Sequence, residues 1–420
     1  MSEAVHPEIY RDRMPFSELM SVSPSTLDML EARGLGKFGR NETVQFCGLA
    51  LGGRVGSAVF LPRQCKELNS DQNLETARLT MKVLARYGAE TPTRLGVEHE
   101  KVGSPSLIAT ISELGGDFRQ FGLFIERQRH KSRDSGKPDW KRTVSREVPF
   151  RGNGSSVVYG SFHSTLSRDS RTNDLAQIQA FVLREIIQRH SWWIDGIQSR
   201  QSELHQVSSP NTSLMGMLQK LRALRTEVYA TRPLRLIENL SSYLSLSSEL
   251  PSDGTLLGVE DFHTVWEHML RKTYSNVEDS WNSRLPVAHY VTAEGGQRHS
   301  LESGMKTDIV VRNDRHLTIL DAKYYDASSV KNVPLWSDIV KQMYYEIAVK
   351  TIIESDETVS NCFVFPAKGN SEGRYVSVQV VDRETEGSLL NFPEIRCIYR
   401  DVRQVMTDFV SGHTKEFSRL

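Results

Sequence analysis

Apolar residues recur with different periods in three successive parts of the chain. In residues 1–172 the period changes often: residues 74–87 have helical spacing, whereas residues 43–61 alternate apolar and small side chains around a glycine pair. The first pattern predicts an amphipathic helix and the second a β-hairpin. We also expect short helices at 25–30 and 107–114, and strands at 118–125 and 140–148 on either side of a basic loop.

A helical period then runs through residues 173–250, which we interpret as a helical connector. Trp192 and Trp193 belong to its apolar surface, and we expect them in the core rather than stacked on nucleic-acid bases. Serine, proline and glycine in residues 247–254 predict a linker. The chain is therefore expected to consist of an N-terminal α+β region that binds DNA or a partner (1–172), the connector (173–250) and a C-terminal domain (251–420).

Helix and strand patterns alternate in residues 251–420, and such alternation predicts one α/β domain. In its longest helix, Trp336, Val340, Met343 and Ile347 are expected to form the buried stripe. Helices are expected at 256–271, at 335–353 and up to about 410, with strands near 289 and at 305–311, 317–323, 360–365, 375–381 and 395–399.

The composition is that of an ordinary globular protein, with 420 residues of which 38% are hydrophobic and 25% charged. General disorder is excluded because this apolar content can build cores. Since no apolar run approaches the roughly 20 residues needed to cross a bilayer, we expect no membrane span, and the polar N-terminus predicts no signal peptide. The four cysteines form no CxxC pair and are expected to be reduced structural thiols of a cytoplasmic protein.

Positive and negative side chains balance at 52 each, but they are unevenly distributed. Residues 119–151 contain ten Lys and Arg residues and four acidic residues. A solvated loop and a surface that follows nucleic-acid phosphates both account for this basic excess.

Candidate chemistry concentrates in residues 306–325, where two β-rich runs flank a polar Asn-Asp turn and predict a hairpin. Because side chains alternate along a strand, Asp321 and Lys323 share a face, and Asp308 meets them from the neighbouring strand if the register is right. Two carboxylates about 4 Å apart repel by roughly 4 kcal/mol at an effective dielectric near 20. Mg²⁺, with Mn²⁺ as a substitute, would relieve this repulsion because it prefers oxygen ligands. The alternative for an isolated Asp-x-Lys is a solvated ion pair at a strand end.

Both helices that flank the hairpin carry polar side chains beside their apolar stripes. Glu267 lies at the edge of the buried face of the preceding helix, where it either reaches into a cleft or remains an exposed charge. In the following helix, Gln342 and Tyr345 share a stripe that can line the hairpin and hold a phosphate or a coordinating water. Tyr344 is the alternative phenol.

The order of these residues resembles that of the PD-(D/E)xK nuclease superfamily, over about residues 256–367. The resemblance implies a mixed sheet flanked by helices and Mg²⁺-dependent cleavage of DNA phosphodiesters. It implies metal ligation by Asp308, Asp321 and Glu267, positioning or polarisation of water by Lys323, and ordering of the site by Gln342 and Tyr345. The chain departs from the family pattern in having Thr307 before the first acid instead of proline, and in a Gln-x-x-Tyr spacing that is one residue short.

A narrower resemblance covers most of the chain. The segments FLP (60–62), GKPDWKRTV (136–144), DFHTVWEHML (261–270) and LDAKYY (320–325) look like those of the LlaJI-type restriction endonuclease family, which is related to McrC nuclease subunits. The resemblance implies an endonuclease subunit of a bacterial restriction or anti-phage system that acts on double-stranded DNA. It also implies an McrB-like AAA+ GTPase or ATPase partner and a cognate DNA methyltransferase.

A separate motor subunit agrees with the absence of a P-loop from this sequence. The nearest candidate, RGLGKFG at 33–39, lacks the first glycine and has Phe38 where Ser or Thr must contact Mg²⁺. Three roles remain possible for Trp140, Lys141 and Arg142: contact with DNA, contact with a partner protein, and a structural role. Two rival functions also remain: a stand-alone repair or transposition nuclease, and a non-catalytic subunit that binds DNA or stimulates an NTPase.

Overall fold

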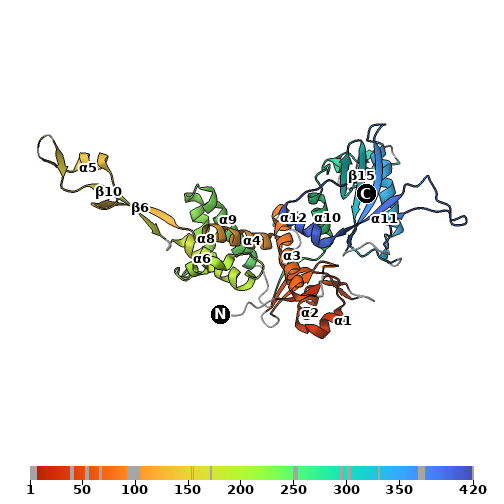
Figure 1. Ribbon diagram of the computed structural model, residues 1–420, viewed down its shortest axis with the longest axis horizontal. Helices are drawn as coiled ribbons and strands as arrows, with labels where there is room; N and C mark the ends of the chain where they lie inside the picture. The colour runs from red at the N-terminus through yellow and green to blue at the C-terminus, as the bar shows by residue number, and fades with distance from the viewer. Residues whose placement is uncertain are drawn as a thin grey trace. The chain divides into compact units, whose positions relative to one another are not determined.

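The protein has a mixed α/β architecture in which two compact units can be described separately. The computed structural model describes residues 7–37, 42–52, 56–65, 69–91, 105–152, 154, 156–170, 173–248, 254–293, 295, 297–299, 304–329, 332–367 and 374–418. One unit combines residues 1–109 with 250–420, and the other comprises residues 110–249 (Figure 1). The three-part division expected from the sequence stays a prediction, because the two compact units are defined by contacts between residues and not by function.

A four-stranded sheet joins N-terminal strands to a strand from the middle of the chain within the first unit. Its order is β1 (Glu8–Arg11), β5 (Gly56–Leu61), β4 (Cys47–Gly52) and β11 (Thr255–Val259). Strands β4 and β5 form the predicted hairpin. Gly48 lies opposite Gly258 across the β4–β11 pairing, and a Cβ on Gly48 would lie 2.2 Å from the carbonyl oxygen of Leu257. Only glycine therefore permits this close approach of the two strands.

The strand β11 corrects one sequence prediction. Residues 256–271 were expected to be one helix, but helix α10 (Phe262–Thr273) begins after Asp261, and the preceding apolar residues are β11. A short apolar run does not distinguish a buried strand from a buried helix. Its strand partner, β4, is far away in the sequence.

Helices cover the N-terminal sheet, and the two that the sequence predicted here are confirmed. The predicted helix at 25–30 is α2, and the one at 74–87 is α3, whose N-cap Asn69 accepts a hydrogen bond from the backbone N–H of Asp71. The elements of this region are α1 (Phe16–Val22), α2 (Pro24–Glu31), β2 (Gly36–Lys37), β3 (Thr43–Val44) and α3 (Ser70–Glu90).

The second sheet of this unit is mixed and five-stranded. Its order is β14 (Ile309–Asn313), β15 (His316–Ala322), β16 (Thr358–Ala367), β18 (Ile395–Asp401) and β17 (Ser377–Val378). The β14–β15 pair is the predicted antiparallel hairpin, whereas β15, β16 and β18 run parallel. Helix α11 (Trp336–Lys350) contacts β15 and β16, and α12 (Val402–Ser411) contacts β18. Two short elements complete the region: the strand pair β12 (His289–Val291) and β13 (Gln297–His299), and a 3₁₀ turn, η2 (Trp281–Ser283).

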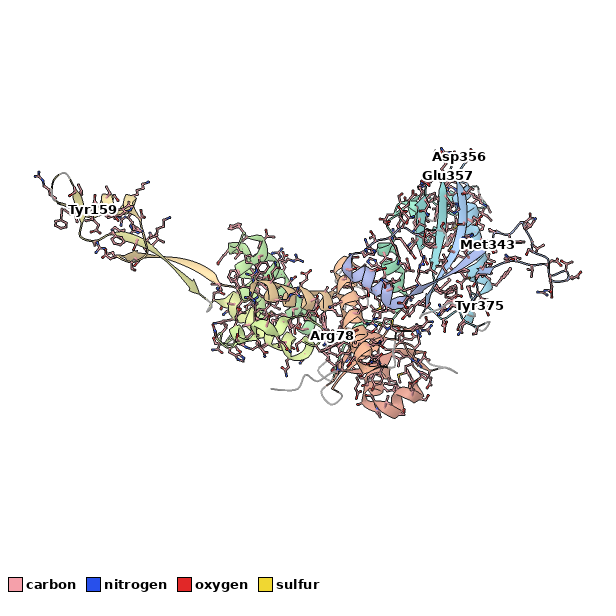
Figure 2. The ribbon with its side chains drawn as sticks, viewed as in Figure 1. Arg78, Tyr159, Met343, Asp356, Glu357 and Tyr375 are labelled. Atoms are coloured by element: carbon pink, nitrogen blue, oxygen red, sulfur yellow. The ribbon has the colours of Figure 1, made fainter. Side chains whose placement is uncertain are left out.

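Helix α11 packs a different face from the one expected. Met343, labelled in Figure 2, does belong to the core, where it packs with Phe363 and Phe365. Trp336, Val340 and Ile347, however, are exposed, and the prediction of a buried apolar stripe is wrong for them. The face that carries Gln342 is buried instead. A polar side chain can be buried where it finds hydrogen-bond partners, and those partners come from another element.

The second unit is mainly helical, as predicted for residues 173–246. Trp192 and Trp193 are buried, which confirms their assignment to the core. The expected short helix at 107–114 continues to Phe121, and β6 begins only at Glu126, so the strand predicted at 118–125 is wrong. Leu114 and Phe118 prolong the buried helical face. The helices are α4 (Pro105–Phe121), α6 (Asp174–His190), η1 (Ile197–Arg200), α7 (Gln201–Leu204), α8 (Leu214–Glu227) and α9 (Thr231–Ser248).

Residues 126–170 of this unit form a segment that we call the arm. It contains β6 (Glu126–Arg133), β7 (Lys137–Pro138), α5 (Trp140–Arg146), β8 (Pro149–Arg151), β9 (Val157–Tyr159) and β10 (His163–Ser170). Strand β6 pairs with β10, and β8 pairs with β9. The strand predicted at 140–148 is wrong, because most of it is helix α5. Asp139 caps this helix by accepting a hydrogen bond from the backbone N–H of Arg142.

The described part of the chain bears on two further expectations. All four cysteines are free thiols, and Cys47, Cys65 and Cys362 are buried, which agrees with structural roles. None of the helices within the described ranges is long and apolar enough to cross a lipid bilayer.

Candidate active site

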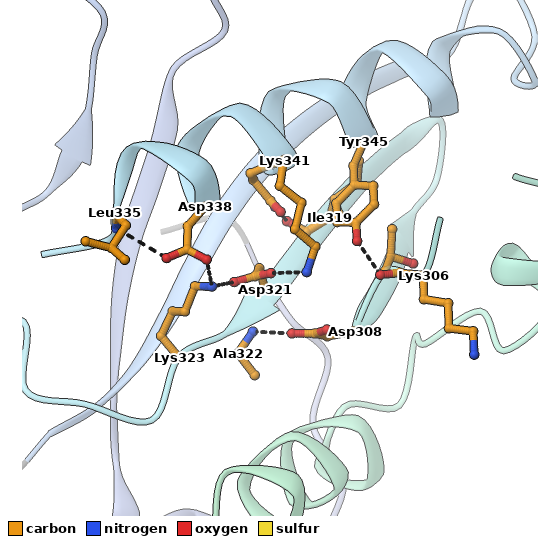
Figure 3. A network of polar contacts seen from close by, with 12 residues as sticks. Lys306, Asp308, Ile319, Asp321, Ala322, Lys323, Leu335, Asp338, Lys341 and Tyr345 are labelled. Atoms are coloured by element: carbon orange, nitrogen blue, oxygen red, sulfur yellow. Dashed lines mark hydrogen bonds and ion pairs between the residues drawn. The ribbon is translucent and has the colours of Figure 1, made fainter. Parts of the chain in front are cut away.

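The β14–β15 hairpin places Asp308 and Asp321 together. Ile309 pairs with Leu320, so the residue before β14 lies beside the end of β15. Asp308 Oδ2 accepts a hydrogen bond of 2.9 Å from the backbone N–H of Ala322, and the side chain of Asp321 is buried nearby (Figure 3). The register required for two converging carboxylates is thus present.

Lys323, directly after β15, lies beside Asp321 because side chains alternate along an extended strand. Its Nζ lies 2.8 Å from Asp321 Oδ2 and 2.8 Å from Asp338 Oδ1. Asp338 itself is held by α11, since its Oδ2 accepts the backbone N–H of Leu335 at 3.2 Å. Burial lowers the pKa of Lys323, but Asp321 and Asp338 outweigh this effect and raise it overall. The lysine is therefore a fixed cation between two carboxylates.

Asp308 is the acid whose ionisation its surroundings disfavour. Burial, together with the negative charges of Asp321 and Glu267, raises the pKa of Asp308 from 3.8 to about 7. Glu267 lies on α10 and is partly exposed, and the structure brings it within electrostatic reach of Asp308. This repulsion is the one that a bound cation would relieve.

Gln342 and Tyr345 attach α11 to the hairpin. The Gln342 side chain is fully buried, and its Nε2 donates a hydrogen bond of 3.0 Å to the carbonyl oxygen of Ile319. The Tyr345 hydroxyl donates to the carbonyl oxygen of Lys306, two residues before Asp308 (Figure 3). The amide N–H of Gln342 and the hydroxyl of Tyr345 donate to backbone carbonyl oxygens, and the expectation that these residues hold a phosphate or a coordinating water stays a prediction. Their placement suits the ordering role, and Tyr344 is exposed on another face.

Thr307, at the position where the superfamily has proline, is anchored by an asparagine. Asn282 Oδ1 accepts hydrogen bonds from the backbone N–H and hydroxyl of Thr307, at 2.8 and 3.0 Å. Its Nδ2 donates to the Thr307 carbonyl oxygen at 3.0 Å. Proline has no N–H to donate, so this arrangement depends on the residue found here. The side chain of Asn282 thereby positions the residue next to Asp308.

Asn282→Ala should lower the free energy of unfolding by about 1–3 kcal/mol, because the buried N–H of Thr307 would lose its partner. It should also weaken divalent-cation binding, since Asp308 would be less well positioned. Urea unfolding and calorimetric titration with Mn²⁺ measure the two effects. Asn211→Ala, at an exposed loop position, serves as the control. Unchanged stability and metal affinity would contradict the anchoring role.

Sequence reasoning gave no role to two charged residues at this site. Lys341 Nζ lies 3.8 Å from Asp321 Oδ1 and 5.4 Å from the centre of the Tyr345 ring. Burial lowers its pKa, but Asp321 and Tyr345 raise it overall. Asp338, the second partner of Lys323, also caps α11. The available signal was their spacing, because Asp338, Lys341 and Tyr345 follow one helix face at i, i+3 and i+7.

The donor set suits a hard cation with few protein ligands. Asp308 and Asp321 supply carboxylates, and buried Asp321 Oδ2 accepts no hydrogen bond from any described residue, since the Lys323 ammonium contacts it only as an ion pair. Among the described residues, no three His, Cys, Asp or Glu side chains are close enough to hold a metal ion together. Mg²⁺ commonly uses one or two carboxylates and completes its shell with water and phosphate. The site fits that pattern without a third carboxylate already in place.

On the arm, the Trp-Lys-Arg-Thr element is anchored by its threonine. Thr143 is fully buried, and its hydroxyl donates to the carbonyl oxygen of Asp139 and accepts the backbone N–H of His163 at 2.9 Å. Trp140 is 58% exposed, and its ring centre lies 6.4 Å from that of Phe162, so its role stays open. Lys141 is exposed and Arg142 is partly exposed, which leaves both available for contacts with another molecule.

Comparison with known proteins identifies a family and one curated relative. The family model described as LlaJI restriction endonuclease matches residues 53–383. The "Type II restriction enzyme BsuMI component YdjA" of Bacillus subtilis (strain 168) is 20% identical over 289 residues, which cover 66% of this chain and 60% of that protein. The chain thus spans less than two thirds of the length of this relative.

Two solved structures from Thermococcus gammatolerans are similar at 14% identity. A refined half-complex from a tetradecameric assembly of McrB AAA+ hexamers with bound McrC matches with a TM-score of 0.44, over 97% of this chain and 98% of that one. The cryo-EM structure of the McrBC complex matches with a TM-score of 0.30, over 63% and 87%. Scores at this level establish neither a shared fold nor a shared activity.

Proposed function

The chain belongs to the LlaJI restriction endonuclease family, and we propose that it is the Mg²⁺-dependent DNA endonuclease subunit of a bacterial restriction or anti-phage system. The observation that carries this proposal is the convergence of Asp308, Asp321 and Lys323 at the end of the β14–β15 hairpin. Two carboxylates and an ammonium at one strand end are costly for stability, and metal-dependent phosphodiester hydrolysis gives a reason for them.

We further propose that the five-stranded sheet is a PD-(D/E)xK core. An antiparallel hairpin followed by parallel strands, with α10 and α11 contacting β15, agrees with the helix–sheet–helix arrangement that the resemblance implies. The order of the acids and the lysine along these elements agrees as well. The capped end of α11 lies against the acids, so one helix both supports the hairpin and supplies Asp338 to the site.

In this proposal the residues have distinct roles. Asp308 and Asp321 hold Mg²⁺, and Glu267 supports the metal or its water from α10. The ion, or Mn²⁺ in its place, activates water and neutralises charge that develops on the phosphate. Lys323 positions or polarises the attacking water, while Asp338 keeps the ammonium in place. Gln342 and Tyr345 keep α11 aligned with both strands of the hairpin.

The arm offers a contact surface for a protein partner. Exposed apolar side chains occur on α5, β8 and β9 and next to these elements. A monomeric protein usually has polar side chains at such exposed positions. They are Trp140, Val144, Val148, Phe150, Val157 and Val158. This surface favours partner contact over DNA contact for Trp140, Lys141 and Arg142. The partner we propose is an McrB-like AAA+ GTPase or ATPase, since this sequence has no P-loop; a cognate methyltransferase in the same system is a further part of the proposal.

Plasmid cleavage tests the nuclease assignment. The full chain, with and without a purified AAA+ partner and nucleotide, should convert supercoiled double-stranded DNA to linear or nicked forms in Mg²⁺ or Mn²⁺ but not in EDTA. Asp321→Ala, purified in parallel, should be inactive because a metal ligand is lost, and this control excludes a contaminating nuclease. Full cleavage by Asp321→Ala would end the assignment for this site. Cleavage by the isolated chain, unaffected by nucleotide, would favour a stand-alone nuclease.

A further inference from the structure

The two lysines at the candidate site differ in how firmly they are held. The Lys323 side chain is 14% exposed, whereas that of Lys341 is 48% exposed. Their ammonium groups approach the Asp321 carboxylate from different sides, one from the end of β15 and the other from α11 (Figure 3). A single buried carboxylate thus has one enclosed and one accessible counter-ion.

The enclosed lysine does not depend on Asp321 alone. Lys323 is also 2.8 Å from Asp338, whose other oxygen caps α11. If the Asp321 carboxylate were taken by another cation, Lys323 would keep this second partner and remain in place. Its position is therefore compatible with metal binding at the same carboxylate.

The accessible lysine has no such second carboxylate among the described residues. The single ion pair of Lys341 within that part of the chain is with Asp321 Oδ1, at 3.8 Å. The Tyr345 side chain and the charge of the more distant Asp308 carboxylate, the other expected metal ligand, also act on its ammonium. A divalent cation bound to Asp321 would remove this attraction and repel the ammonium, because like charges at such distances interact unfavourably. Since the lysine side chain is flexible and half exposed, its displaced ammonium would face solvent at the place where a DNA phosphate must approach.

We propose that Lys341 is an exchangeable counter-ion, which pairs with Asp321 in the metal-free site and contacts a DNA phosphate when a divalent cation takes its place. This inference rests on the proposed nuclease function. It assigns the two lysines different tasks, with Lys323 fixed at the reacting centre and Lys341 moving between the protein carboxylate and the substrate.

Lys341→Met tests this role because it should change two binding constants in opposite directions. Affinity for Mn²⁺, measured by calorimetry without DNA, should rise about three- to tenfold, since the variant lacks the cation that competes for Asp321. Affinity for a short DNA duplex in Ca²⁺ should fall, and the slope of log K against log salt should become shallower by about 0.9, the value for one phosphate contact. In EDTA the slope should be the same as in the unmodified protein, because Lys341 is then paired with Asp321.

Two further variants serve as controls. Lys350→Met removes the same charge from α11, but Lys350 pairs with Glu346 and not with the site acids. Neither the affinity for Mn²⁺ nor the affinity for the DNA duplex should therefore change. Lys341→Arg keeps the charge and should restore the salt dependence. A structural role for Lys341 would instead weaken metal and DNA binding together.

The outcomes separate this inference from the proposed function. If Lys341→Met leaves Mn²⁺ affinity unchanged or weakens it, or leaves the salt slope in Ca²⁺ unchanged, the counter-ion role is wrong even though the unmodified chain still binds metal and cleaves DNA. If the unmodified chain binds no divalent cation, the proposed function and this inference both fail.

Discussion

Asp308→Asn should stabilise the metal-free protein at pH 8 by up to about 4 kcal/mol and at the same time abolish DNA cleavage. The pKa of Asp308 is raised from 3.8 to about 7, and each pKa unit corresponds to about 1.4 kcal/mol. At pH 8 the folded protein therefore carries the cost of an ionised carboxylate beside Asp321 and Glu267. Asparagine removes the charge but keeps an oxygen that can accept the N–H of Ala322.

The stabilisation expected from Asp308→Asn depends on pH. Because the folded-state pKa of Asp308 is raised, the folded protein binds more protons than the unfolded chain between pH 3.8 and about 7. The contribution of Asp308 to the stability of the folded protein is thus most favourable at low pH, and it is lost as the pH rises through that window. Urea unfolding in EDTA at pH 5 and pH 8 should show a larger gain for Asp308→Asn at pH 8.

An exposed aspartate provides the control for that experiment. Asp28→Asn, on the exposed side of α2, should change stability little at either pH. Adding Mg²⁺ should stabilise the unmodified protein and not Asp308→Asn, because binding to the folded state alone stabilises it. If Asp308→Asn raised the free energy of unfolding equally at both pH values, ionisation of Asp308 would not carry the cost assigned to it.

Lys323→Met should lower kcat for DNA cleavage by about 10²–10³-fold, the range for loss of one positioned group that stabilises charge in the transition state. Methionine preserves most of the aliphatic volume and removes the ammonium that lies 2.8 Å from both Asp321 and Asp338. Metal binding should persist, because the carboxylate ligands remain. Single-turnover cleavage and calorimetric titration with Mn²⁺ measure these two properties separately.

The interpretation of Lys323→Met requires that the protein remain folded. Asp338 loses its ion-pair partner but still caps α11 through the N–H of Leu335, so thermal unfolding in Mg²⁺ should remain cooperative. Lys350→Met, which removes a lysine of α11 that pairs with Glu346, should cleave at the unmodified rate. Cleavage by folded Lys323→Met at that same rate would exclude Lys323 from the reaction.

Most elements of the fold were predictable from local periodicity, and two of the errors share one cause. The hairpins, α2, α3 and the helices of residues 173–246 were read correctly because each has an unambiguous period. Residues 256–259 and 140–148 were assigned the wrong structure because their short patterns fit both helix and strand. In the first case pairing with β4 decides the structure, and in the second the Asp139 cap and buried Thr143 support the helix.

The candidate site was predictable where neighbours on one strand or one hairpin define it. Asp321 and Lys323 follow from strand alternation, and Asp308 follows from the hairpin order. The roles of Lys341 and Asp338 did not, because the local pattern of α11 does not show that these side chains reach Asp321 and Lys323. Asn282 was missed for a similar reason: nothing in its local sequence indicates that it would bind the backbone of Thr307.

Amino-acid order alone thus carries the identity of the acids, the central lysine and the hairpin, because backbone geometry repeats every two or 3.6 residues wherever the segment lies. The register of β14 against β15, the face that α11 buries and the insertion of β11 into the N-terminal sheet come from the folded chain. They depend on the free energy of packing and hydrogen bonding between segments that are distant in sequence, which no local pattern contains. For the same reason Lys341 can be recognised beside Asp321 only once α11 has packed on the sheet.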